Sequence, residues 1–280
     1  RIGVSAGSAG TYELSGGFFD MEGEETIGGA GSGTFVQTGG THFIYDDNPL
    51  VIGADTGGVG TYTLSAGSLL NPAIETIGKS GSGTFNQSGG THSGGELHMA
   101  ANAGSSGSYT LSGSSQLTFG YEYIGEQGVG LFTQLGGSHT SNGGVTVGVS
   151  GLGTYQLMGG TLTVVGPEIV AASAAGNSLQ SGGTFIHSGG TNSISTSLDI
   201  AQQAGSTGSY ALSGSGQLLA TTEVVGEHGT GTFTQTGGAN IVGSGGLEIG
   251  AAAEALGTYA LTGGTLKVNG PVIIGESATG

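Results

Sequence analysis

A short aromatic motif recurs eleven times along the chain and restricts it to repeat architectures. Six copies follow the pattern of 60-GTYTL-64, and five follow 83-GTFNQ-87. Tyr and Phe alternate without exception, at steps of 23 to 30 residues. The aromatic residues are Tyr12, Phe35, Tyr62, Phe85, Tyr109, Phe132, Tyr155, Phe185, Tyr210, Phe233 and Tyr259. Self-similarity at such a period indicates stacked repeats, so the sequence divides into units of about 25 residues.

Each unit contains three short segments of alternating polarity separated by Gly-rich turns. In the third unit these are 61–65, a segment around Leu69 and Leu70, and 75–78. Strands this short cannot bury a face alone, but stacked copies can cover one another. We therefore predict an all-β fold: a parallel β-solenoid (β-helix) of about eleven coils, ~25 residues per coil, with Tyr-type and Phe-type coils alternating. Residues 1–280 would form a single solenoid repeat domain, with Gly at the positive-φ corners.

The alternating pattern also predicts which side chains face the interior. The aromatic residues would form one internal ladder of stacked rings. A second internal column would consist of Ile27, Ile52, Ile77, Ile124, Val147, Ile200, Val225, Ile249 and Ile274.

Polar residues alternate with apolar ones inside this predicted core. Two residues after the aromatic, Tyr-type units carry Leu, whereas Phe-type units carry Gln37, Gln87, Gln134, His187 and Gln235. Near the aliphatic column, Tyr-type units carry Glu25, Glu75, Glu122, Glu168 and Glu223, whereas Phe-type units carry Leu or Val. Because buried polar groups need partners, we expect each internal Gln to bond the Tyr hydroxyl or the Glu carboxylate of an adjacent coil. Such bonds would fix which coil stacks on which.

An outward column of mostly hydroxyl residues precedes the aromatic ladder and suits a solvent-facing or sugar-facing surface. Its members are Thr11, Thr34, Thr61, Thr84, Ser108, Leu131, Thr154, Thr184, Ser209, Thr232 and Thr258. Three triplets resemble the flat hydroxyl arrays of ice-binding β-solenoids: Thr61-Thr63-Ser65, Ser108-Thr110-Ser112 and Thr232-Thr234-Thr236. Elsewhere residues such as Glu13 and Val36 interrupt the array, so ice binding remains an alternative.

Three histidines are candidate metal ligands: His42, His92 and His139 each follow the double Gly of a Phe-type unit. Asn192 and Asn240 take this place later in the chain. We interpret them as polar residues flanking a turn. Successive histidines would lie two coils apart, at a spacing of about 9.5 Å. This is too far for them to share one zinc ion, whose distance to each ligand nitrogen is about 2.0–2.1 Å.

The glutamate column resembles paired catalytic carboxylates only superficially, because it repeats five times whereas an active site is a single asymmetric constellation. We therefore predict no catalytic residues, no cofactor-binding residues and no enzyme. A weak surface calcium site is the one cofactor that the sequence suggests, because carboxylates cluster at two places. Its candidate ligands are Asp20, Glu22, Glu24, Asp46 and Asp47, and Glu25 belongs to the same acidic patch.

Charge and hydropathy exclude two classes of partner. Only three residues are Lys or Arg, against 19 Asp and Glu, for a net charge of −16. So few cations cannot neutralise a run of phosphates, which excludes nucleic-acid binding. The sequence also lacks an apolar run of about 18 residues, so we expect no membrane insertion by this segment.

The pair GTY-x-LSGG and GTF-x-QSGGTH, with E-x-IG closing the coil, resembles the Gly-rich β-solenoid repeats of bacterial secreted and surface proteins. These include autotransporter passenger-like and PEP-CTERM-type proteins. The resemblance covers essentially the whole chain. It implies export to the extracellular space or the bacterial cell surface, a role as adhesin, sheath, matrix or filament, and no catalytic residues.

The two ends of the sequence read as interrupted coils, since 1-RIG-3 matches the tail of a Phe-type unit and 273-IIGESATG-280 precedes the place of another GTF. We expect either a longer array or subunits that stack end to end as a homopolymer, and head-to-tail contacts of that kind produce filaments. The predicted function is thus a structural extracellular protein that builds a surface fibre, filament or matrix. The alternative is a surface adhesin, glycan-binding or ice-binding module.

Overall fold

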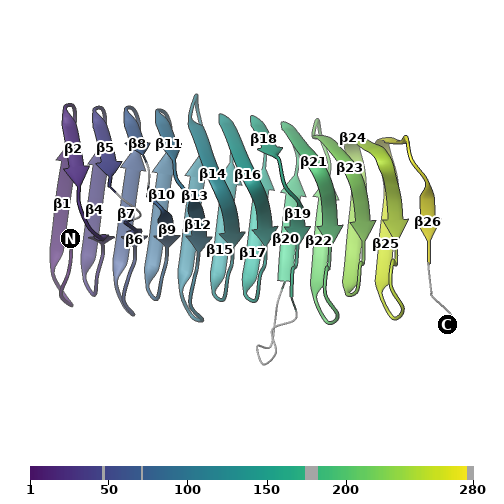
Figure 1. Cartoon of the computed structure of the whole chain (residues 1–280), viewed down its shortest axis with the longest axis horizontal. Helices are drawn as coiled ribbons and strands as arrows, with labels where there is room; N and C mark the ends of the chain where they lie inside the picture. The colour runs from purple at the N-terminus through teal and green to yellow at the C-terminus, as the bar shows by residue number, and fades with distance from the viewer. Residues whose placement is uncertain (46–47, 71, 174–181, 276–280) are drawn as a thin grey trace.

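The computed structural model describes residues 1–45, 48–70, 72–173 and 182–275, and every regular element in these ranges is a β-strand. The strands belong to one sheet of 26 strands, and all their pairings are parallel. Successive coils lie side by side along the long axis, so the colour runs in order from the N-terminus to the C-terminus (Figure 1). The predicted parallel β-solenoid with alternating Tyr-type and Phe-type coils is confirmed.

The strands stack in three columns, and each coil is named here by its aromatic residue. The first column, which carries the aromatic motif, contains β1 (Ala9–Leu14), β4 (Ser32–Gln37), β7 (Val59–Leu64), β10 (Ser82–Gln87), β13 (Ser106–Leu111), β15 (Val129–Gln134), β17 (Leu152–Leu157), β20 (Gly182–His187) and β22 (Thr207–Leu212). The second contains β2 (Phe18–Met21), β5 (Thr41–Ile44), β8 (Ser68–Leu70), β11 (Thr91–Ser93) and β18 (Thr161–Val164). The third contains β3 (Glu25–Ile27), β6 (Leu50–Ile52), β9 (Ile74–Ile77), β12 (Glu96–Met99), β19 (Glu168–Val170) and β26 (Val272–Ile274).

In the remaining coils one strand continues through more than one column. The second and third columns merge in β14 (Gln116–Ile124), β16 (Ser138–Val147), β21 (Thr191–Ile200) and β23 (Gln217–Val225). All three columns merge in β24 (Thr230–Ile249), and the first two merge in β25 (Leu256–Val268). Bulges mark the bend between columns in β14, β21 and β23.

The aromatic ladder runs in register through all eleven coils, beginning with the pairs Tyr12–Phe35 and Phe35–Tyr62. Neighbouring rings lie 4.6 to 5.0 Å apart between centroids, and from Phe35 onward their planes agree within 9°. The rings are buried except in the two end coils, where Tyr12 is 38% exposed and Tyr259 is partly buried. The predicted aliphatic column is likewise internal, apart from Ile249, which is partly buried, and Ile274, which is exposed.

Positive-φ corners follow the aliphatic column, as at Gly28, whose φ is 71°. The expectation that glycine fills these corners is wrong for three coils, where Ala100, Ala171 and Ala201 adopt φ values of 56°, 69° and 58°. The aromatic motif requires Gly before its Thr or Ser for a different reason. A Cβ at Gly60 would lie 2.2 Å from the carbonyl oxygen of Ile27, so the close approach of two coils requires glycine there.

Candidate functional site: a buried polar ladder

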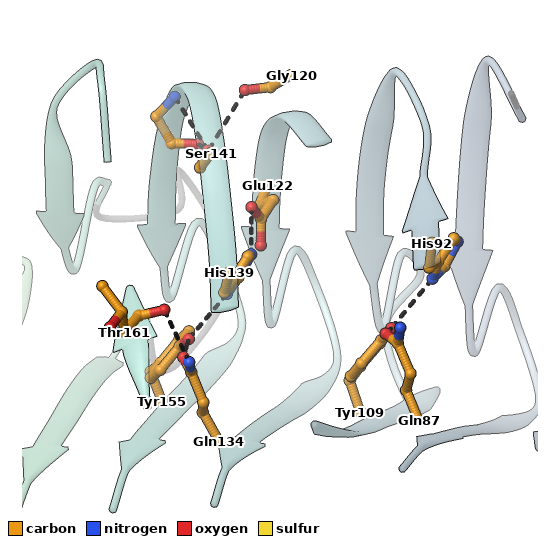
Figure 2. Close-up of polar contacts among 11 residues, drawn as sticks. Gln87, His92, Tyr109, Gly120, Glu122, Gln134, His139, Ser141, Tyr155 and Thr161 are labelled. Atoms are coloured by element: carbon orange, nitrogen blue, oxygen red, sulfur yellow. Dashed lines mark hydrogen bonds and ion pairs between the residues drawn. The ribbon is translucent and has the colours of Figure 1, made fainter. Parts of the chain in front are cut away.

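One hydrogen-bonded network of four polar side chains recurs along the interior, and the copy around Gln87 shows its construction. The hydroxyl of Tyr109 donates to Gln87 Oε1 at 2.6 Å, and His92 Nδ1 lies 3.0 Å from the same hydroxyl (Figure 2). On its other side, His92 Nε2 lies 2.8 Å from Glu75 Oε2. All four side chains are at most 1% exposed. The network therefore ties together three successive coils, those of Tyr62, Phe85 and Tyr109.

The hydrogen-bond inventory fixes where the protons of this network lie. Gln87 Nε2 donates to the carbonyls of Gly90 and Gln116, which orients Oε1 toward Tyr109. Because the Tyr109 hydroxyl has one proton and donates it to Gln87, its oxygen must accept from His92 Nδ1–H. The other ring nitrogen of His92, Nε2, then faces the Glu75 carboxylate at ion-pair distance.

Two further copies use the same four residue types. In one, His42 Nδ1 lies 2.9 Å from the Tyr62 hydroxyl, which donates to Gln37, and His42 Nε2 lies 2.8 Å from Glu25 Oε2. In the other, shown in Figure 2, His139 lies 2.9 Å from the Tyr155 hydroxyl and 2.8 Å from Glu122 Oε1. The Tyr155 hydroxyl donates to Gln134 at 2.6 Å, and Gln134 Nε2 donates to the Thr161 carbonyl.

The two C-terminal copies replace the histidine with asparagine. Asn192 Nδ2 donates to Glu168 at 2.9 Å, and Asn240 Nδ2 donates to Glu223 at 3.0 Å. Burial raises the pKa of Glu168 to about 8, an effect that the Asn192 hydrogen bond partly opposes. Burial likewise raises the pKa of Glu223 to about 7. Glu168 is thus mainly protonated at neutral pH, because its Asn partner cannot supply a compensating positive charge.

The copy at Tyr210 shows a second replacement, because His187 stands where the others have Gln. Its Nε2 lies 3.2 Å from the Gly190 carbonyl, so Nε2 carries the proton, and Nδ1 accepts from the Tyr210 hydroxyl at 2.9 Å. Burial lowers the pKa of His187 to about 4, which is consistent with this neutral tautomer. The imidazole thus reproduces the acceptor and the donor that Gln87 supplies through its amide. Asn192 also donates to the Tyr210 hydroxyl, at 3.3 Å.

The hypothesis of Gln bonds between coils is confirmed for the Tyr hydroxyl, in the pairs Gln37–Tyr62, Gln87–Tyr109, Gln134–Tyr155 and Gln235–Tyr259. The five predicted Glu residues instead meet His or Asn. The polar–apolar alternation is also observed in the register, where Glu75 lies between Leu50 and Leu97. The polar groups thus follow the alternation of coil types.

The three histidines do follow Gly-rich turns, but their side chains are fully buried, so they also belong to the core. The sequence did contain a signal. In the register, His92 lies between Leu69 and Leu117 of the neighbouring Tyr-type coils, so its position is internal. Comparing Phe-type with Tyr-type units at this place would have shown a third polar–apolar alternation.

Among the described residues, the suggested calcium ligands are not assembled into a site. Within the described ranges, no three His, Cys, Asp or Glu residues are grouped to hold a metal ion. Asp20, Glu22 and Glu24 are exposed, and Glu24 accepts from Thr26 and lies 3.5 Å from Arg1. Glu25, in contrast, is buried in the ladder. Asp46 and Asp47 lie outside the described residues.

The surface carries one cluster that the sequence reasoning missed. His98 Nδ1 lies 2.8 Å from Glu126 Oε2, and His98 Nε2 lies 3.1 Å from Glu96 Oε2. Burial lowers the pKa of His98, but its hydrogen bonds to Glu126 and Glu96 outweigh this effect, and the net shift is upward. The cluster does not recur in the other coils as far as the structure describes them.

Comparison with known proteins gives no relative. No protein-family model, no curated protein and no solved structure matches the chain. Among the described residues there is also no helix with the length and apolar character needed to cross a bilayer.

Proposed function

We propose that this chain is a structural protein that builds an extracellular surface fibre, filament or matrix by stacking β-solenoid coils, and that it is not an enzyme. The observation that carries the proposal is the buried polar ladder. Its five copies commit the internal titratable groups to contacts between coils, so these groups serve stacking and are closed to a substrate.

The two end coils support a partner made of further coils. The Tyr12 coil exposes Tyr12 at 38%, and the Tyr259 coil exposes Leu261 and Ile274 at 49% and 74%. Apolar faces of this kind fit another coil of the same array or a coil of a second copy. The proposed partner is therefore a further coil of this kind, in a longer array or in an end-to-end homopolymer of the chain.

Location at the bacterial cell surface or outside the cell belongs to the same proposal and is supported by the resemblance of the repeats to those of secreted and surface proteins. The net charge of −16 would keep neighbouring fibres apart. It would also oppose contact between two copies at low salt, so added salt should promote assembly by screening the repulsion.

Size-exclusion chromatography with electron microscopy tests the proposal. We expect the purified chain to form elongated fibres in a concentration-dependent manner, with more assembly at about 0.5 M than at about 0.02 M salt because the Debye length shortens. A monodisperse monomer without fibres across this range would refute the assembly claim. A hydrolytic or transferase activity that depends on buried residues of the ladder would refute the structural role.

A further inference from the structure

A groove lies on the outer surface over the coils of Tyr62, Phe85 and Tyr109. The groove has a volume of about 490 Å³, and its walls include Pro72, Ile74, Glu96 and Tyr121. Ile74, Glu96 and Tyr121 face one another in register across three successive coils, at the entry to the third column. The groove therefore combines an apolar side chain, a carboxylate and an aromatic ring in one row.

Tyr121 provides a fixed aromatic surface. Its ring lies against the next coil at Gly143, where an added Cβ would come within 2.5 Å of two ring carbons. Glycine at 143 thus lets the ring lie close to the backbone on one side. The residue nevertheless remains 51% exposed, and Ile74 across the row is 43% exposed. Two large apolar groups held open to solvent in this way indicate a surface for a ligand.

The polar edge of the groove offers hydrogen bonds and little net charge. Glu96 and Glu126 share His98 through contacts of 3.1 and 2.8 Å, and the His98 ring lies 4.9 Å from that of Tyr123. The raised pKa of His98 favours the imidazolium, which matches the carboxylates that contact it. Glu96 Oε2 is held by His98, while Oε1 makes no hydrogen bond to the described residues, so it can accept from a ligand.

We propose that this groove binds a neutral pyranose residue of a glycan, with a C–H face of the sugar on Tyr121 and its hydroxyls donating to Glu96. A ligand with one apolar face and a rim of hydroxyls matches an aromatic ring beside a carboxylate. Anionic ligands are disfavoured by the two carboxylates and the net charge of −16. His98 offsets the charge of one of the two carboxylates, which weakens the attraction for polyamines. This inference does not depend on fibre formation.

The test uses three neutral probes, cellohexaose, maltohexaose and chitohexaose, with spermidine as a cationic probe, each followed by ligand-observed NMR titration of the full chain. We expect saturable binding of at least one hexaose. Tyr121→Ala should weaken it by roughly tenfold or more, whereas Tyr121→Phe, which keeps the ring, should retain it. Phe18→Ala is the control, because Phe18 is an exposed aromatic residue, at 65%, in the Tyr12 coil, outside the three coils that carry the groove.

Melting curves check that the variants fold. We expect them to fold, because Tyr121 is exposed. The proposal is overturned if none of the three hexaoses binds, or if Tyr121→Ala binds as well as the unaltered chain. Tighter binding of spermidine than of every hexaose also overturns it, because the groove would then select cations.

Discussion

Replacing Glu168 with Gln should remove a large part of the loss of stability between about pH 4.5 and pH 8. Glu168 is fully buried, its polar partner is Asn192, and the whole chain contains only three Lys and Arg residues. Its pKa rises from a reference of 4.5 to about 8 in the folded state. Between these two pH values, the folded protein thus holds a proton that the unfolded chain has already released.

The sign follows from proton linkage. Because the folded pKa lies above the unfolded one, the stabilisation is complete below pH 4.5 and is lost as pH rises through about 8. Across this window the slope is about 1.4 kcal/mol per pH unit, so the total approaches about 5 kcal/mol. Gln has nearly the same shape and no acidic proton. The Glu168→Gln variant should therefore gain in free energy of unfolding, relative to the unaltered chain, as pH rises.

Urea unfolding followed by circular dichroism between pH 4 and pH 9 measures this difference. Glu223→Gln is a matched variant, for which the gain should level off near pH 7 because the pKa of Glu223 is about 7. A difference in unfolding free energy between Glu168→Gln and the unaltered chain that stays constant across this range would refute the reasoning. It would show that Glu168 is already ionised when buried.

Three further predictions concern the ladder and the corners. Gln87→Leu should lower the free energy of unfolding by about 3 kcal/mol, because it removes the acceptor of the Tyr109 hydroxyl and the donors to two carbonyls. Gln87→His, which copies His187, should lower it less. Thermal unfolding compares the two variants, and equal losses would contradict the assigned roles. His92→Asn, which copies the partner of Glu168, should make urea stability fall more steeply with rising pH; an unchanged profile would count against the pairing with Glu75. Ala201→Gly should raise the unfolding free energy by about 1 kcal/mol, and Gly250→Ala should lower it by a similar amount, because both sites have positive φ. A Cβ at Gly250 would meet nothing closer than 3.7 Å, so a clash would not add to the effect. Changes of the opposite sign would refute this reasoning.

Much of the fold could be predicted from the sequence because the repeat is explicit. The Tyr–Phe alternation gave the coil number, the register and the internal ladder, and the Leu–Gln alternation gave the bond from Gln87 to Tyr109. These succeeded because every coil supplies the same local evidence.

The features that were missed depend on packing or on single coils. His92 follows a Gly-rich turn, and only its pairing with Leu69 and Leu117 shows that it faces inward. Ala201 fills a corner that glycine fills in most coils, so the motif alone hides its positive φ. The cluster of Glu96, His98 and Glu126 forms because neighbouring coils bring residues 28 positions apart into contact, and nothing in the repeat marks it.

The central claim is that buried Glu–His–Tyr–Gln networks hold the coils in order, and imidazole nitrogen NMR tests it most directly. The ¹⁵N shifts of His42, His92 and His139 should show a protonated Nδ1, because each Nδ1 donates to a Tyr hydroxyl that itself donates to Gln. An unprotonated Nδ1 in these three residues would contradict the account.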